Sequence, residues 1–188
     1  MRRQMRATAV RQRGFTLFEL IVTIVIVAVL GALALPSFGS AMRRGRMTTE
    51  TNDLIGAINL ARTEAITRAA PVSICPSADG AACSADATTW KDGWMVFVDY
   101  ANPGEVDAGD GDIVLRIWAK IDPKDSVTAT ATYLRFAPTG SATFGGGDTD
   151  VTKFLLKPEQ CADDYDGRQI NVGALGRANS QRTCVLVP

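Results

Sequence analysis

Residues 15–38 read FTLFELIVTIVIVAVLGALALPSF, a run of 24 residues in which Glu19 is the single charged side chain. At about 1.5 Å per residue a helix of this length reaches roughly 36 Å, and the hydrocarbon core of a bilayer is roughly 30 Å thick. The sequence therefore predicts one membrane-spanning helix over residues 15–38. Five arginines precede the run. The positive-inside rule then places residues 1–14 in the cytoplasm and the rest of the chain outside.

Glu19 distinguishes this anchor from a cleavable secretory signal. A basic start, an apolar run and the small-x-small triplet at residues 32–34 also fit a signal peptide. The core of an ordinary signal, however, is an uninterrupted run of about 7 to 15 apolar residues. A carboxylate at the fifth position of the run is expensive in lipid and marks a functional site that needs a partner. The anchor is favoured, and cleavage after Ala34 is the alternative.

Two residues weaken the second half of this helix. Gly31 lowers helix propensity, and Pro36 removes one backbone hydrogen bond and clashes with the preceding turn. We therefore expect a kink or local melting around Gly31 and Pro36.

Residues 39–70 are predicted to continue the helix as an amphipathic rod. Apolar residues recur there mostly every three or four positions, which is a helical period; they are Met47, Leu54, Ile58, Ala61 and Ala65, with Ile55 and Ile66 beside them. This stripe should face a sheet, and Pro71 should stop the helix. The polar positions are interpreted as a solvated face; they are Glu50, Asp53, Arg62, Glu64 and Arg68.

Residues 71–188 have the pattern of a β-rich head, so the chain is predicted to be α+β. Short apolar segments separated by Gly, Pro and Asp predict strands at 71–75, 93–99, 112–119, 126–136, 151–157, 168–173 and 182–187. The acidic stretch from Asp99 to Asp112 is interpreted as a solvated hairpin turn. It lacks the ligand spacing of a twelve-residue calcium loop.

The absence of histidine excludes most hydrolase and metalloenzyme mechanisms, because it removes the usual base near neutral pH and the commonest metal ligand. We predict no enzyme, no cofactor and no metal. Outside the cytoplasm the four cysteines should form two disulfides. Local pairing of Cys75 with Cys83 and of Cys161 with Cys184 is the simplest of three connectivities. A zinc site is the competing interpretation, although the spacings lack CxxC pairs.

Residues 13–20, RGFTLFEL, resemble the leader junction of type IV prepilins and pseudopilins. The resemblance implies that a prepilin peptidase cuts between Gly14 and Phe15, so that residues 1–14 are a leader peptide, and that Phe15 is then N-methylated. It also implies that Glu19 is an assembly residue. The partner that its burial demands would be the terminal amine of Phe15, in the same subunit or in a neighbour.

The head resembles the GspH/FimT branch of minor pilins and pseudopilins. The resemblance rests on NDL at 52–54, ARTEAITR at 61–68, VSIC at 72–75, WKDGWMVFVD at 90–99 and LR at 115–116. ALPSF at 34–38 is more similar to the FimT/FimU minor pilins than to the type II secretion pseudopilin. The resemblance to this branch implies a long helix on an antiparallel sheet. It also implies a structural subunit that helps to prime assembly at or near the pilus tip.

The same resemblance implies the partners and the location of the chain. The partners would be the prepilin peptidase, other major and minor pilins and the inner-membrane assembly platform. The subunit would sit in the bacterial inner membrane with its head in the periplasm and would later enter the fibre.

Three arginines near the C-terminus raise a second hypothesis, DNA binding. Arg168, Arg177 and Arg182 occur after residue 167 without any acid, and arginines can contact DNA phosphates. Some FimT-type minor pilins bind DNA through a Gly-Arg-x-Arg motif, whereas this chain has Asn179 in place of the second arginine. Residues 47–188 carry 12 basic and 19 acidic side chains, a balance that repels DNA at long range.

Overall fold

The computed structural model describes residues 14–146, 150–161 and 166–187, with the backbone alone at residues 33–38. The predicted leader falls almost entirely outside the described residues. The chain divides into two compact units, Met1–Ala41 and Met42–Pro188.

One helix, α1 (Leu17–Arg68), contributes to both units. It confirms the predicted helix to within two residues at each end, and it continues through Gly31 and Pro36. A kink at these two residues stays a prediction. Before the helix, Thr16 acts as the N-cap, since its Oγ1 accepts a hydrogen bond from the Glu19 backbone N–H at 3.2 Å.

The C-terminal end of α1 closes with two backbone hydrogen bonds. Ala70 N–H donates to Ala65 O and Ala69 N–H donates to Ile66 O, which is the pattern of a Schellman motif. Ala69 occupies the left-handed position of this motif with φ of 51°, a conformation that favours glycine. Pro71 follows and prevents the helix from continuing.

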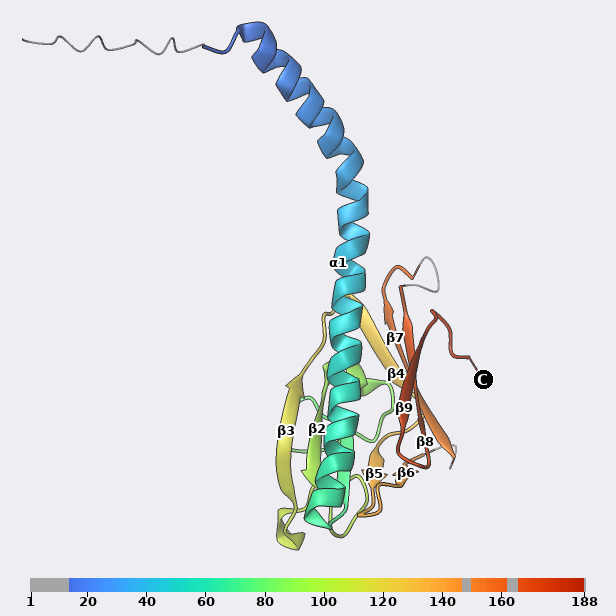
Figure 1. Cartoon of the computed structure of the whole chain (residues 1–188). Coiled ribbons are helices and arrows are strands. Elements are labelled where there is room, and N and C mark those ends of the chain that lie inside the picture. The colour runs from blue at the N-terminus through green and yellow to red at the C-terminus, as the bar shows by residue number, and fades with distance from the viewer. Residues whose placement is uncertain (1–13, 147–149, 162–165, 188) are drawn as a thin grey trace, which may run out of the picture. The chain divides into compact units, whose positions relative to one another are not determined.

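The head contains two antiparallel sheets (Figure 1). The five-stranded sheet has the order β3-β2-β1-β5-β6; its strands are β1 (Val72–Pro76), β2 (Gly93–Val98), β3 (Ile113–Ala119), β5 (Leu134–Phe136) and β6 (Ala142–Phe144). The four-stranded sheet has the order β4-β7-β8-β9; its strands are β4 (Asp125–Ala129), β7 (Val151–Pro158), β8 (Arg168–Gly173) and β9 (Ala178–Arg182). Two short 3-10 helices, η1 (Thr89–Asp92) and η2 (Ala108–Asp110), lie in the connections around β2.

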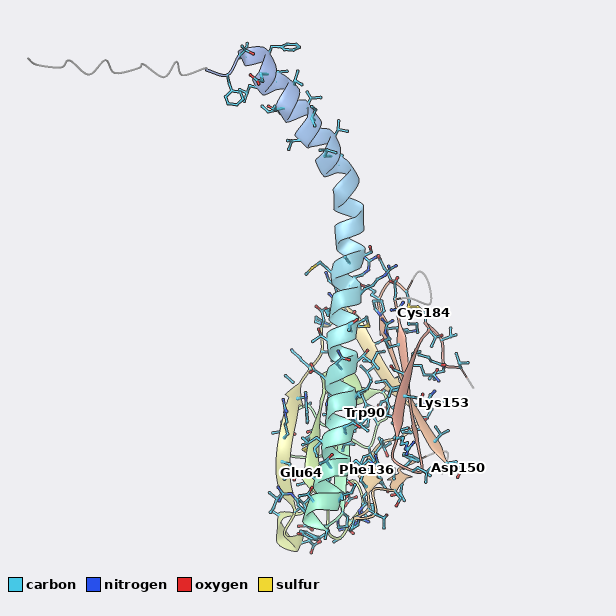
Figure 2. The ribbon with its side chains drawn as sticks, in the orientation of Figure 1. Glu64, Trp90, Phe136, Asp150, Lys153 and Cys184 are labelled. Carbon is cyan, nitrogen blue, oxygen red and sulfur yellow. A yellow bond between two sulfur atoms is a disulfide. The ribbon has the colours of Figure 1, made fainter. Side chains whose placement is uncertain are left out.

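The head has one main core, which residues from α1 and from both sheets share. The buried stripe of α1 consists of Met47, Leu54, Ala57, Ile58, Ala61 and Ala65, all fully buried. Trp90 lies in the middle of the head (Figure 2), and its ring meets Phe154 edge-on at 4.8 Å between centroids. The Trp90 Nε1–H donates to Ala131 O at 3.1 Å, so the buried indole is satisfied.

Several expectations about the head are wrong in detail. The predicted strand at 126–136 is two strands in different sheets, β4 and β5, because the chain changes sheets between Ala129 and Leu134. The predicted strand at 182–187 is absent, since β9 ends at Arg182. β6 and β9 were not predicted. β9 reads ANSQR and has no buried residue, so it carries no alternation of apolar side chains.

Two polar positions differ from the solvated face predicted for α1. Glu50 is only 8 % exposed, and the Arg62 Nε–H donates to Gly140 O at 3.1 Å. Glu64 and Arg68 form the i, i+4 ion pair that their spacing permits. The acidic stretch after β2 is largely exposed, but its first residue, Asp99, is fully buried and binds Ser73 and Arg135.

Both disulfides have the local pairing. Cys75 is bonded to Cys83 and Cys161 to Cys184, with Cα–Cα distances of 5.6 Å and 6.0 Å. Each lies within the usual range for a disulfide. The described part of the head therefore has no free thiol.

Candidate subunit-assembly site

The first unit presents an uncovered apolar helix. Between Phe15 and Leu30 the large apolar side chains are exposed, from 38 % at Val22 to 84 % at Phe15. An apolar surface of this length in water marks contact with lipid or with other protein chains. No helix in the described part of the chain combines the length and the hydropathy needed to cross a membrane. The predicted span stays a prediction.

Glu19 is the one acidic group of residues 15–38, and it lies in the first turn of α1. Thr16 and Glu19 have the spacing of a capping box, and a carboxylate here interacts favourably with the positive end of the helix dipole. Cleavage after Gly14 would place a positively charged amine on Phe15, two residues before the helix begins. The first turn thus brings a carboxylate and a prospective amine close in the chain, on an otherwise apolar surface.

A partly buried ionic cluster joins α1 to the start of β4. The Arg46 guanidinium bonds both carboxylate oxygens of Asp125, with Nη2 at 3.0 Å from Oδ1, and lies 3.5 Å from Asp122. Glu50, one turn further along α1, accepts a hydrogen bond from the Asp122 N–H at 3.3 Å. Its second oxygen is buried without a hydrogen-bond partner.

Burial raises the pKa of Glu50 to about 7, and repulsion from Asp125 adds to the shift. The hydrogen bond from Asp122 and the charge of Arg46 act in the opposite direction. Glu50 therefore takes up a proton on folding over much of the pH range below neutrality. This cluster fixes the loop before β4 to α1 and makes that junction sensitive to pH.

A second polar site is a groove of about 410 Å³ lined by Arg44, Gly45, Thr48, Arg168 and Arg182. Arg168 and Arg182 are direct partners across β8 and β9, so their side chains start from neighbouring positions. Burial, and secondarily the charge of Arg182, lowers the pKa of Arg168. Arg44 reaches the groove from α1 and pairs with the buried Asp166 at 3.1 Å. The structure thus brings together two of the three predicted arginines.

Arg177 is separate from this groove. It is exposed and lies just before β9, whereas Arg182 is the last residue of that strand, so roughly 17 Å of extended chain separates them. Gly176 has a structural role here, with φ of +71° and no room for a Cβ, which would lie 2.3 Å from Gly140 O. The Gly176-Arg177 pair is therefore explained by a tight turn.

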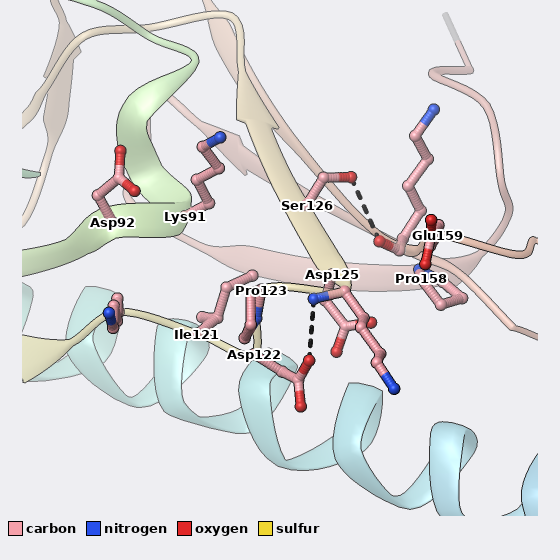
Figure 3. Close-up of a pocket in the computed structure, with 12 residues that line it drawn as sticks. Lys91, Asp92, Ile121, Asp122, Pro123, Asp125, Ser126, Pro158 and Glu159 are labelled. Atoms are coloured by element: carbon pink, nitrogen blue, oxygen red, sulfur yellow. Dashed lines mark hydrogen bonds between the residues drawn. The ribbon is translucent and has the colours of Figure 1, made fainter.

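A third cavity, of about 490 Å³, lies between the loop before β4 and the end of β7 (Figure 3). Its charged lining residues are Lys91, Lys120, Lys124, Lys157, Asp92, Asp122, Asp125 and Glu159. Ser126 Oγ donates to Lys157 O at 3.3 Å across one wall. Four cations balance four anions, so this cavity favours neither an anionic nor a cationic ligand.

Metal chemistry has no evident place in the described residues. No group of three or more His, Cys, Asp or Glu among residues 14–146, 150–161 and 166–187 could hold a metal ion. All four cysteines are used in disulfides. The features that remain are surfaces: an apolar helix with one carboxylate, and a head with charged grooves.

An exposed apolar N-terminal helix and a helix-plus-antiparallel-sheet head define the class of pilin-like subunits. In agreement, the prokaryotic N-terminal methylation motif matches residues 10–35. The family described as type II transport protein GspH matches residues 50–176, which is more than half of the chain. The chain belongs to this GspH/FimT family of minor type IV pilins and pseudopilins.

The fold is similar to that of the type IV minor pilin FimU of Pseudomonas aeruginosa, seen in two crystal forms. One structure has a TM-score of 0.54 at 17 % identity, covering 76 % of this chain and 97 % of FimU. The other has a TM-score of 0.51 at 16 % identity, covering 73 % and 99 %. A comparison with curated proteins found no match. The α+β pilin fold predicted from the sequence is confirmed.

Sequence reasoning missed three features of the sites. Arg44 had no visible link to Arg168 and Arg182, because the groove depends on tertiary packing. Glu50 was assigned to the solvated face, although its place three residues after the buried Met47 is a spacing that returns to the same side of a helix. The Thr16-x-x-Glu19 spacing is the sequence signal of a capping box and indicates where α1 begins.

Proposed function

We propose that this chain is a minor type IV pilin, a structural subunit that takes part in priming pilus assembly and lies at or near the pilus tip. The observation that carries the proposal is the uncovered apolar helix with Glu19 as its single acid, inside a matched methylation motif. Residues 15–38 store the subunit in the inner membrane. After extraction the same apolar surface packs against the helices of neighbouring subunits in the fibre.

In this proposal Glu19 selects the position of the incoming subunit. Removing a carboxylate from water without a partner is costly, whereas pairing it with a buried amine offsets much of that cost. The amine is that of Phe15, exposed when a prepilin peptidase removes residues 1–14. A neighbour that is out of register leaves both charges unpaired, so the pair specifies the stagger between subunits.

The test is the variant Glu19→Ala, with Glu64→Ala as a matched control in the head part of α1. Glu19→Ala should still enter the membrane, since it removes a charge from the apolar run, but it should be lost from purified fibres. Glu64→Ala should assemble normally, because it removes only a surface ion pair. Fibre incorporation of Glu19→Ala at the level of the original chain would contradict the proposed role.

Processing is tested by the intact mass and the N-terminal residue of the protein taken from its native membrane. The proposal expects a chain that begins with N-methylated Phe15. A chain that begins at Leu35 would mean ordinary signal cleavage and would remove the membrane helix from the mature protein. The assembly platform and the other pilins are the partners that crosslinking in the membrane should then capture.

A minor pseudopilin of type II secretion is the alternative within the same family. The family model is named after a transport protein, and the fold is shared with a pilin. Deleting the gene and scoring piliation and secretion side by side separates the two. Loss of secretion with normal piliation would overturn the pilus assignment and keep the assembly mechanism.

DNA binding remains a separate hypothesis for Arg168, Arg177 and Arg182. Arg168 and Arg182 share the groove, which supports a phosphate contact there, whereas Arg177 stands apart from it. The test is salt-sensitive DNA binding of Arg177→Ala and Arg182→Ala. Unchanged DNA binding in both variants would contradict the DNA-binding hypothesis for these arginines.

A further inference from the structure

The arginine groove lies at the end of the head that contains the first head residues of α1. Arg44, Gly45 and Thr48 form one wall and the cross-strand pair Arg168 and Arg182 forms the other. The Arg168 guanidinium also donates a hydrogen bond to Gly167 O at 2.9 Å. Gly167 in turn lies directly against the backbone of Thr183 and Cys184, the second of which is labelled in Figure 2. The like charges of Arg168 and Arg182 lie close together in this wall, and the charge of Asp166 partly offsets that of Arg182 at Arg168.

A second basic cavity occurs on the same turns of α1. It has a volume of about 230 Å³, and its charged lining residues are Arg43, Arg46, Lys124 and Glu159. The two cavities together gather six cations, although residues 47–188 as a whole are acidic. Among the described acids, Glu159 lines the second cavity, whereas Asp125 and Asp166 are buried beneath Arg46 and Arg44. Among the described residues, the lining of these two cavities therefore holds six cations and one acid.

An exposed apolar tail follows β9 at the end of the head that carries the arginines. Val185, Leu186 and Val187 are 63 %, 45 % and 37 % exposed, and the head core does not include them. The tail is not loose, because Val187 N–H donates to Gln169 Oε1 at 2.6 Å and Val187 O accepts from Gln169 Nε2 at 3.0 Å. Gln169 is the residue after Arg168. Since successive side chains of a strand point to opposite faces, the tail is held at the same end of β8 as Arg168 but on the opposite face of the sheet.

The position of these groups along the chain indicates what they meet. Arg43, Arg44 and Arg46 follow Phe38, the last residue of the predicted span, within eight positions. Even a fully extended chain limits Arg44 to about 22 Å from Phe38, and a helical one to about 9 Å. Headgroups occupy roughly 5–8 Å on each side of the hydrocarbon core. A long arginine side chain at Arg44 is therefore confined to the neighbourhood of the lipid phosphates while the subunit is stored.

We propose that this end of the head, formed by Arg43, Arg44, Arg168, Arg182 and the 185–187 tail, binds the phosphate headgroups of anionic phospholipids in the storage membrane. The proposal rests on the membrane-stored subunit of the proposed function. The groove takes a phosphate between Arg168 and Arg182, and the apolar tail enters the interface from the other face of the same sheet end. This contact holds the head against the bilayer until extraction releases it.

A lipid surface fits these observations better than DNA does. Exposed valine and leucine side chains at the same end of a domain as clustered arginines are the composition of an interfacial anchor, whereas phosphate contacts to DNA need no apolar neighbour. In the proposed function residues 15–38 anchor the chain in the bilayer, and this raises the effective concentration of headgroups near the groove. DNA would instead have to approach against the acidic remainder of the head.

The test uses the full mature chain in nanodiscs of phosphatidylcholine alone or of phosphatidylcholine mixed with phosphatidylglycerol. Hydrogen exchange of the amides in residues 168–187 reports contact, and co-migration with the discs reports insertion. Exchange should be several-fold slower in the anionic discs, and salt should abolish the difference. Arg182→Gln should reduce the slowing of exchange about five-fold. The double variant Arg168→Gln/Arg182→Gln should reduce it about five-fold further. Arg177→Gln is the matched control and should behave like the original chain.

Three results would overturn the proposal. Equal exchange in both kinds of disc, with the chain inserted, would exclude the headgroup contact and leave the membrane-stored subunit intact. Equal slowing by inorganic phosphate with neutral discs, or by duplex DNA alone, would assign the groove to a free anion or to nucleic acid. Failure to co-migrate with discs would overturn both this contact and the membrane storage on which it rests.

Discussion

The apolar residues of α1 before Ala41 and those after it have opposite surroundings. From Phe15 to Leu30 the large apolar side chains are 38–84 % exposed, whereas Met47, Leu54 and Ile58 are fully buried. Both segments are helical and both are read easily from the sequence. The described part of this chain therefore does not bury the first segment, which in the proposed function is buried by lipid or by other subunits. The head completes its own core and is stabilised further by two disulfides.

The largest effect should come from the head core and should be absent from the first segment. Phe154→Ala removes a fully buried ring that packs on Trp90, and a Phe-to-Ala change in a core costs about 3–5 kcal/mol. Ile24→Ala, at a side chain 60 % exposed, should leave the free energy of unfolding of the head unchanged. Urea unfolding followed by tryptophan fluorescence measures this, because Trp90, Trp94 and Trp118 all lie in the head. Equal destabilisation by both variants would contradict the stated difference in burial between the head core and the first segment of α1.

The next effect concerns the disulfides. Replacing Cys161 and Cys184 with serine should lower the free energy of unfolding by about 3.4 kcal/mol, because the chain-entropy cost grows with loop length. Replacing Cys75 and Cys83 should cost about 2.5 kcal/mol, since their loop is shorter. The same urea titration, under oxidising conditions, gives both values. A larger loss for the shorter loop would show that local packing outweighs chain entropy.

The buried Glu50 makes the stability of the head depend on pH. Its pKa of about 7 in the folded head exceeds its ordinary value of 4.5, so its contribution to stability is fully present below about pH 4.5 and is lost as the pH rises through 7. Glu50→Gln removes this dependence. The stability difference between the variant and the original chain should therefore change by about 1–3 kcal/mol between pH 4.5 and 8, in favour of the variant at high pH.

The matched control for Glu50 is Asp53→Asn, an exposed carboxylate on the same helix. It should leave the pH profile of the unfolding free energy nearly unchanged. A Glu50→Gln variant with the same profile as the original chain would show that the Glu50 carboxylate is not protonated by its burial in the cluster.

The smallest effect is expected at the end of α1. Ala69→Gly should stabilise the head by about 0.5–1 kcal/mol, because glycine adopts the left-handed position of the Schellman motif without the strain of a Cβ. Thr67→Gly is the contrasting change within the helix and should destabilise it by a few tenths of a kcal/mol, because threonine is itself a weak helix former. Thermal unfolding of the two variants gives opposite shifts if the C-cap is correctly described.

Local features were predictable because they depend on neighbours in the chain. The period of apolar residues gave the two halves of α1, and Pro71 gave its end to within two residues. Strands with apolar alternation or compact apolar runs, such as β2 and β7, were also found. The leader junction and the head motifs placed the chain in its family, which the matches to residues 10–35 and 50–176 confirm.

The failures have a common physical reason: they depend on which segments meet in space. β9 is a polar edge strand whose only signal is its pairing with β8, while the apolar residues 185–187 resemble a buried strand and are exposed. Glu50 became buried because the loop before β4 covers it. The groove joins Arg44 to residues more than 120 positions away.

The sequence by itself therefore determined the class of this protein: an apolar helix with one carboxylate, a leader junction and a β-rich head with two disulfides. Only the tertiary structure decided which charges meet. Helical period and motif spacing are properties of a few consecutive residues, whereas a groove between Arg44, Arg168 and Arg182 exists only after α1, β8 and β9 pack together.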